Sequence, residues 1–188
     1  MEEEVKKDIL DVLKKSLEAI KKEDIVNLRE LSNHTLHDAS IYQDDYSTTI
    51  AIIIYSLSKV FERVSYREYK SWSMFYKNIL EFFDKAIKAL EEDNIEDYEV
   101  IVHDMFNTIY DLEPKLRDYI INVFQGARIH KASRLHEHGV SVGRVAEILG
   151  LSEFEIMDYL GKTGIADVEF SITRDVRERI KFVRGIFK

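Results

Sequence analysis

A chain of 188 residues that is 45% hydrophobic is long enough for one ordinary domain, or for a medium domain with a small appendage. The absence of cysteine excludes disulfides and thiolate metal sites, and one proline with seven glycines favours long helices over a many-stranded sheet. The formal net charge of −8 is uneven: residues 126–188 carry 11 Lys and Arg against 9 Asp and Glu, a net of +2, which leaves −10 on residues 1–125. We therefore expect any contact with a polyanion in the C-terminal third.

The N-terminal third contains three runs of apolar residues at helical spacing. The first covers residues 5–20 and the second residues 24–39. The third run, TIAIIIYSLSKVFERV, is apolar on most sides, which predicts a central, buried helix capped by Ser47 or Thr48. A strand over residues 50–55 is the alternative, but the helical periodicity around it favours the helix.

The middle of the chain predicts three further helices. An aromatic-rich helix covers residues 66–91 and a second covers residues 95–111. Pro114 fits the first turn of the third, which continues to Gly139 as a natural C-terminal cap. The aromatic residues of the first of these helices exceed one inward stripe, so we expect some of them to meet a second copy in a homodimer: Trp72, Phe75, Tyr76, Phe82 and Phe83.

The segment VSVGRVAEILGLSEFEIMDYL, residues 140–160, has the pattern of a helix-turn-helix. Such a motif needs a small residue where its helices cross, a glycine in its left-handed turn and a branched apolar residue between the helices. Counted from Val142, the fifth, ninth and fifteenth positions supply them: Ala146, Gly150 and Ile156. Ser152 is a suitable N-terminal cap for the second helix. The helix that ends near Gly139 completes a trihelical unit.

The second helix of this motif has an unusual charge for a DNA-contacting helix. Its outward N-terminal positions carry Glu153, Phe154, Met157 and Asp158. Apolar side chains can touch a thymine methyl group, but carboxylates repel the phosphates that supply most of the affinity. Neighbouring cations must then provide the positive charge. The nucleic-acid-binding residues predicted in this unit are Arg128, Lys131, Arg134, Arg144, Phe154, Met157 and Lys162.

The C-terminal arm is the most basic segment of the chain. After Gly164 we expect a short extended piece and then a helix capped by Thr173. Its basic residues are predicted to contact phosphates beside the motif, with a solvated helix face as the alternative. The residues concerned are Arg174, Arg177, Lys181 and Arg184.

Residues 130–165 resemble the small helix-turn-helix proteins of archaea and bacteria that are often classed with antitoxins. The shared run is A-x-x-L-x-x-x-G-x-S-x-G-x-A-A-E-x-x-G-L-S, in which Val145 replaces the first of the paired alanines. An acidic, aromatic second helix that ends in glycine also agrees. The resemblance covers under a quarter of the chain and implies a small regulatory or antitoxin-like module.

Residues 28–61 resemble the HEPN helical domains, which implies a ribonuclease as one alternative. Those enzymes use an Arg and a His separated by four to six residues, and Arg29 and His34 have that bare spacing. On a helix, however, residues five apart are offset by about 140°, and the pair lies in the wrong helix for the family. Three further histidines near the end of the sixth helix, at positions 130, 136 and 138, lack the helical spacing of zinc ligands. We predict no catalytic residue, no metal ligand and no cofactor.

The sequence thus predicts an all-α protein, with a bundle of about five helices in residues 1–125. Residues 126–188 are predicted to form a trihelical helix-turn-helix unit with a basic C-terminal helix. The favoured function is a non-enzymatic, dimeric DNA-binding regulator. It is expected to be cytoplasmic, since no apolar run is long enough to span a membrane. The alternatives are an RNA- or ribosome-associated protein that uses the basic arm, a protein partner at the acidic helix of the motif, and a HEPN-type ribonuclease or toxin–antitoxin component.

Overall fold

The computed structural model describes residues 1–163 of the chain. These residues form α-helices joined by short turns, with one 3₁₀ segment and no strand among them. The predicted all-α class is confirmed, and residues 50–55 lie in a helix rather than a strand. The elements are α1 (Glu3–Lys21), α2 (Ile25–Tyr42), α3 (Asp45–Glu62), η1 (Val64–Glu68), α4 (Trp72–Glu91), α5 (Ile95–Tyr110), α6 (Pro114–Glu137), α7 (Val142–Leu149) and α8 (Glu153–Thr163).

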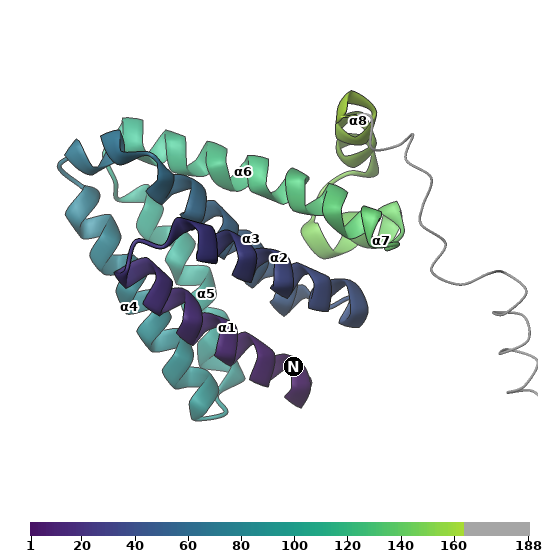
Figure 1. Cartoon of the computed structure of the whole chain (residues 1–188), viewed down its shortest axis with the longest axis horizontal. Helices are drawn as coiled ribbons and strands as arrows, with labels where there is room; N and C mark the ends of the chain where they lie inside the picture. The colour runs from purple at the N-terminus through teal and green to yellow at the C-terminus, as the bar shows by residue number, and fades with distance from the viewer. Residues whose placement is uncertain (164–188) are drawn as a thin grey trace, which may run out of the picture.

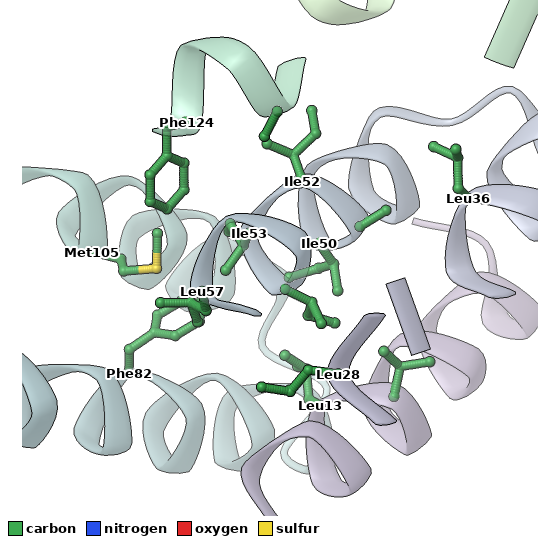
Figure 2. Packing of buried hydrophobic residues seen from close by; sticks show 14 of the residues in the cluster. Leu13, Leu28, Leu36, Ile50, Ile52, Ile53, Leu57, Phe82, Met105 and Phe124 are labelled. Atoms are coloured by element: carbon green, nitrogen blue, oxygen red, sulfur yellow. The ribbon is translucent and has the colours of Figure 1, made fainter. Parts of the chain in front are cut away.

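Helix α3 lies at the centre of the helical body, as its all-round apolar sequence predicts. Ile50, Ile53 and Leu57 are fully buried in it, and α1, α2 and α6 all pack against this helix. Figure 2 shows Ile53 and Leu57 lying among Phe82 of α4, Met105 of α5 and Phe124 of α6. Each such fully buried side chain contributes roughly 1.5–3 kcal/mol to folding.

Polar side chains fix where the helices of the body begin. Asp24 accepts a hydrogen bond from the backbone N–H of Asn27 at 3.0 Å at the start of α2, and the side chain of Asn94 caps α5 in the same way. The predicted cap of α3 at Ser47 or Thr48 is wrong. The helix begins earlier, because Asp44 accepts from the backbone N–H of Ser47 at 2.7 Å.

The aromatic residues of α4 are accommodated within one chain. The helix begins at Trp72 rather than at the predicted residue 66, because residues 64–68 form the separate η1 turn. Its inward stripe is buried, and Trp72 and Tyr76 pack against Phe61 of α3 with ring centroids 5.7 and 6.0 Å apart. These rings pack within the chain, with Trp72 and Tyr76 half-buried, and the homodimer stays a prediction.

Helix α6 connects the body to the helix-turn-helix unit. It begins at Pro114 as predicted, packs on α2, α3 and α5 of the body, and contacts α7 and α8 near its C-terminal end (Figure 1). The predicted boundary between residues 125 and 126 falls inside this one continuous helix. Within residues 1–163, no helix is both long and apolar enough to cross a membrane.

Candidate recognition surface of the helix-turn-helix unit

Helices α6, α7 and α8 pack together as the trihelical unit that the sequence predicts. The hydroxyl of Ser141 accepts from the backbone N–H of Arg144 at 3.3 Å and caps α7. Gly150 ends α7 with φ of 58°, in the left-handed region where a side chain is strained. Ile156 and Leu160 are each 1% exposed, so the inner face of α8 is buried against α6 and α7.

Two of the three acidic residues on α8 stabilise the helix itself. The carboxylate of Glu155 accepts from the hydroxyl and the backbone N–H of Ser152 at 2.7 and 2.8 Å, while the Ser152 hydroxyl accepts from the Glu155 N–H at 3.2 Å. This is a capping box, and the hydrogen bonds from Ser152 hold the pKa of Glu155 below its usual range. Asp158 pairs with Lys162 at 2.6 Å one turn later. Much of the unusual acidity of α8 is therefore explained by local structure.

The outward face of α8 exposes two large apolar side chains. Phe154 is 79% exposed and Met157 is 50% exposed, and residues three apart lie on the same face of a helix. We call the side chains of Glu153, Phe154, Met157 and Asp158 the outer face of α8. Figure 1 shows α8 beside the C-terminal part of α6, on the side away from α1 to α5. Phe154 and Met157 are thus accessible, as expected for outward positions of this helix.

Arg128 is half-buried, and its guanidinium contacts the turn between α7 and α8. One of its terminal nitrogens, Nη2, donates to the carbonyl of Leu149 and, at 3.2 Å, to that of Gly150. The last carbonyls of a helix lack partners within it and attract a cation. Arg128 thus closes the C-terminal end of α7 and the turn before α8.

The structure removes Lys131 from the predicted phosphate contacts. Its side chain is fully buried, and the ammonium donates to the side-chain oxygen of Asn33 in α2 at 3.0 Å. The same nitrogen lies 4.6 Å from the centre of the Tyr55 ring in α3, a cation–π contact. Burial lowers the pKa of Lys131 to about 8. This charge is buried between α6 and the body and is not accessible to a phosphate.

The remaining predicted cations of the unit lie at the surface, each beside a carboxylate. Arg134 pairs with Glu137 at 2.6 Å, Arg144 with Glu147 at 2.7 Å, and Lys162 with Asp158. Arg144 also donates to the backbone carbonyl of Gln43, at the end of α2, at 2.9 Å. Exposed ion pairs of this kind contribute only about 0–1 kcal/mol, so a phosphate can compete for the cation. The basic arm residues Arg174, Arg177, Lys181 and Arg184 lie outside the described residues.

The residues considered for catalysis or metal binding are held by separate partners. Arg29 forms an ion pair with Glu62 at 2.5 Å, whereas Nδ1 of His34 lies 3.0 Å from Asp38. His130 stacks on Tyr55 with ring centroids 5.1 Å apart, and burial lowers its pKa. No group of three or more His, Asp or Glu side chains in residues 1–163 is arranged to hold a metal ion.

Sequence reasoning missed the partners of Lys131 and a cavity beside Arg128. Asn33 and Tyr55 are far from Lys131 in the sequence, and neither belongs to a recognisable motif. A cavity of about 360 Å³ lies where α3, α5, α6 and α7 meet, and Arg128 lines it. The spacing of residues within one helix does not show where four helices meet. Neither feature was therefore predictable from the sequence pattern.

No protein-family model matches the chain, and comparison with curated proteins and with solved structures gives no significant match. The two resemblances noted in the sequence are not tested by these comparisons and stay predictions.

Proposed function

We propose that the protein is a non-enzymatic regulator that binds duplex DNA through the outer face of α8. The observation that carries the proposal is the 79% exposure of Phe154, beside Met157, on the second helix of the motif. In helix-turn-helix proteins the N-terminal residues of this helix contact base edges in the major groove. Phe154 and Met157 are suited to the methyl group of thymine, and the acid of Glu153 to the amino group of cytosine.

Surface cations supply the attraction to phosphates in this proposal. Arg134 and Arg144 are exposed enough to exchange a carboxylate for a phosphate, since their side chains are 47% and 38% exposed. The basic residues of the arm, within 174–184, add further positive charge. Because the acids of α8 oppose this attraction, we expect weak binding with a strong dependence on salt. A homodimer would double the number of phosphate contacts, and light scattering at tens of micromolar protein measures whether one forms.

The test is binding of the purified full-length protein to a pool of random duplexes at about 50 mM salt, where electrostatic binding is strong. Arg144→Gln should weaken binding equally for all sequences and reduce the salt slope by about one unit. The control is Lys77→Gln on α4, because this exposed lysine lies in the body and should leave the slope unchanged. The absence of any duplex binding at this salt would contradict the proposal.

A second candidate is that α8 docks on a protein. The observation in its favour is that every predicted cation in residues 126–163 contacts a carboxylate, a carbonyl or the side chain of Asn33. An exposed apolar pair bordered by acids matches the apolar centre and polar rim of a protein interface. Under this candidate, Phe154→Glu abolishes retention of a nuclease-resistant partner, while the duplex binding of Phe154→Glu equals that of the wild type. Loss of duplex binding in the same variant would favour DNA.

A further inference from the structure

The cavity between the body and the helix-turn-helix unit has the dimensions of a ligand site. Its volume of about 360 Å³ lies in the range of roughly 300–1,000 Å³ that is typical of pockets for small molecules. Tyr110, at the end of α5, lines the cavity and is 63% exposed, so one edge reaches solvent. A small molecule therefore has both a space to occupy and a way to enter it.

The lining of this cavity combines an apolar wall with a single charge. Aliphatic and aromatic side chains dominate it, including Ile52 of α3, Phe106 of α5, and Ile121 and Phe124 of α6. Among the lining residues that belong to 1–163, Arg128 is the one cation, and there is no Asp or Glu. A guanidinium at the edge of an apolar space favours an anion, because charge-assisted hydrogen bonds are strong where water is displaced.

An adjoining hollow has the opposite character. Thr49 and Phe106 line both spaces, but the second, of about 430 Å³ between α3 and α5, is bordered by Asp45, Glu99 and His103. Its carboxylates would repel an anionic ligand. The two hollows thus share an apolar wall and differ in charge, which makes the second a matched control for the first.

We propose that the cavity lined by Arg128 binds a small molecule with an apolar body and a carboxylate head, such as a medium-chain fatty acid. The carboxylate pairs with the guanidinium, and the chain lies against Ile52, Phe106 and Ile121. This site is separate from the outer face of α8 and does not depend on what that face binds.

The contacts of Arg128 connect this site to the helix-turn-helix turn. The guanidinium donates to the carbonyls of Leu149 and Gly150, and its charge also acts on Glu155 in the capping box of α8. A ligand carboxylate competes with these carbonyls for the same cation. Occupancy is therefore expected to loosen the turn between α7 and α8.

The first experiment is calorimetric titration of the full-length protein with decanoate, decanol and decylamine below their micelle concentrations. Decanoate should bind at least about tenfold more tightly than decanol, since a charge-assisted hydrogen bond of about 1.4 kcal/mol is tenfold in affinity. Decylamine should bind still less well beside the guanidinium. Equal affinity for decanoate and decanol, or no decanoate binding, would overturn the proposal.

Two matched substitutions to tryptophan locate the ligand. Ile121→Trp fills the cavity beside Arg128 and should abolish decanoate binding, while Val102→Trp fills the acidic hollow and should leave it unchanged. Circular dichroism confirms that both variants are folded. If Val102→Trp removes binding and Ile121→Trp does not, the assignment of the site is wrong.

Arg128→Gln tests the charge and the connection to the turn. This variant removes the charge, and its affinities for decanoate and decanol should become equal. In the wild type, decanoate should accelerate amide hydrogen exchange at Leu151 and Ser152, and Arg128→Gln should lose this effect. Unchanged exchange in the wild type with decanoate bound would contradict the connection, whatever partner α8 has.

Discussion

The seam between the body and the helix-turn-helix unit differs from the outer face of α8 in what its side chains do. At the seam, Arg128 contacts the carbonyls of Leu149 and Gly150, and Lys131 contacts the side-chain oxygen of Asn33. On the outer face, Phe154 and Met157 contact solvent. The side chains at the seam thus serve stability, and those on the outer face are available for recognition. A cation close to a helix-turn-helix in the sequence therefore need not contact a phosphate. Substitutions at the seam should change stability, and those on the outer face should change binding.

The largest stability effect is expected at Lys131. Its pKa falls from 10.5 to about 8 on folding, which corresponds to a penalty of about 3 kcal/mol near neutral pH. The unfolded chain binds more protons between these two values, so the penalty is complete below about pH 8 and disappears as the pH rises towards 10.5. Lys131→Met removes this penalty together with the hydrogen bond to Asn33 and the contact with Tyr55, so at pH 7 it should be more stable than the wild type by less than about 3 kcal/mol, measured by urea unfolding.

The pH dependence separates this effect from simple packing. The stability difference between Lys131→Met and the wild type should shrink steadily from pH 8 to 10.5. A difference that stays constant across this range would show that the charge of Lys131 carries no penalty at the seam.

A smaller loss is expected when the cation at the end of α7 is removed. Arg128→Met leaves the carbonyls of Leu149 and Gly150 without their donor, which costs about 2 kcal/mol by the usual range for hydrogen bonds to charged groups. The control is Arg134→Met on the same helix, where an exposed pair with Glu137 contributes about 0–1 kcal/mol. Equal losses in the two variants would remove the distinction between seam and surface.

Two glycines of the unit should respond with opposite signs. Gly150→Ala forces a side chain into the left-handed region and should cost about 1 kcal/mol. Gly126→Ala lies inside α6 with open space around the new methyl group, and should stabilise by about 0.5–1 kcal/mol. Thermal unfolding of both variants checks the pair. Stabilisation by Gly150→Ala would mean that the turn does not need the left-handed residue.

Much of the fold followed from patterns within single helices. The apolar sequence of residues 50–55 predicted a buried central helix, and Pro114 and Gly150 predicted a helix start and a helix end. Ser152 predicted the cap of α8. These features are local. The proline ring, the glycine without a side chain and the apolar periodicity each act on the helix in which they lie.

Two predictions were inaccurate within single segments, the cap of α3 and the start of α4. The others concern contacts between helices. Lys131 and Arg134 are equivalent cations in the sequence, but one faces Asn33 and Tyr55 and the other faces solvent. Similarly, the aromatic stripe of α4 looked too wide for one bundle because the sequence does not show that Phe61 packs against both Trp72 and Tyr76. Which face of a helix meets which neighbour is decided by packing, and spacing within one helix does not contain that information.

The smallest stability effect is expected on the outer face of α8. Phe154→Ala should change the free energy of unfolding by less than about 0.5 kcal/mol, because the ring is 79% exposed and α8 keeps its buried Ile156 and Leu160. Val26→Ala, at an exposed apolar position of α2, is the matched control. A loss of 2 kcal/mol or more in Phe154→Ala would mean that the ring packs on the folded chain and is not available to a partner.

The most direct test of the central claim is selection of duplexes from a random pool by the wild type and by Phe154→Ala, with Val26→Ala as the control. If the outer face of α8 contacts base edges, the wild type enriches a defined sequence and Phe154→Ala enriches a different or less defined one, with overall affinity changed little. Val26→Ala should enrich the wild-type sequence. Identical sequence preferences for the wild type and Phe154→Ala, or no enrichment by either, would contradict the claim that this face binds DNA.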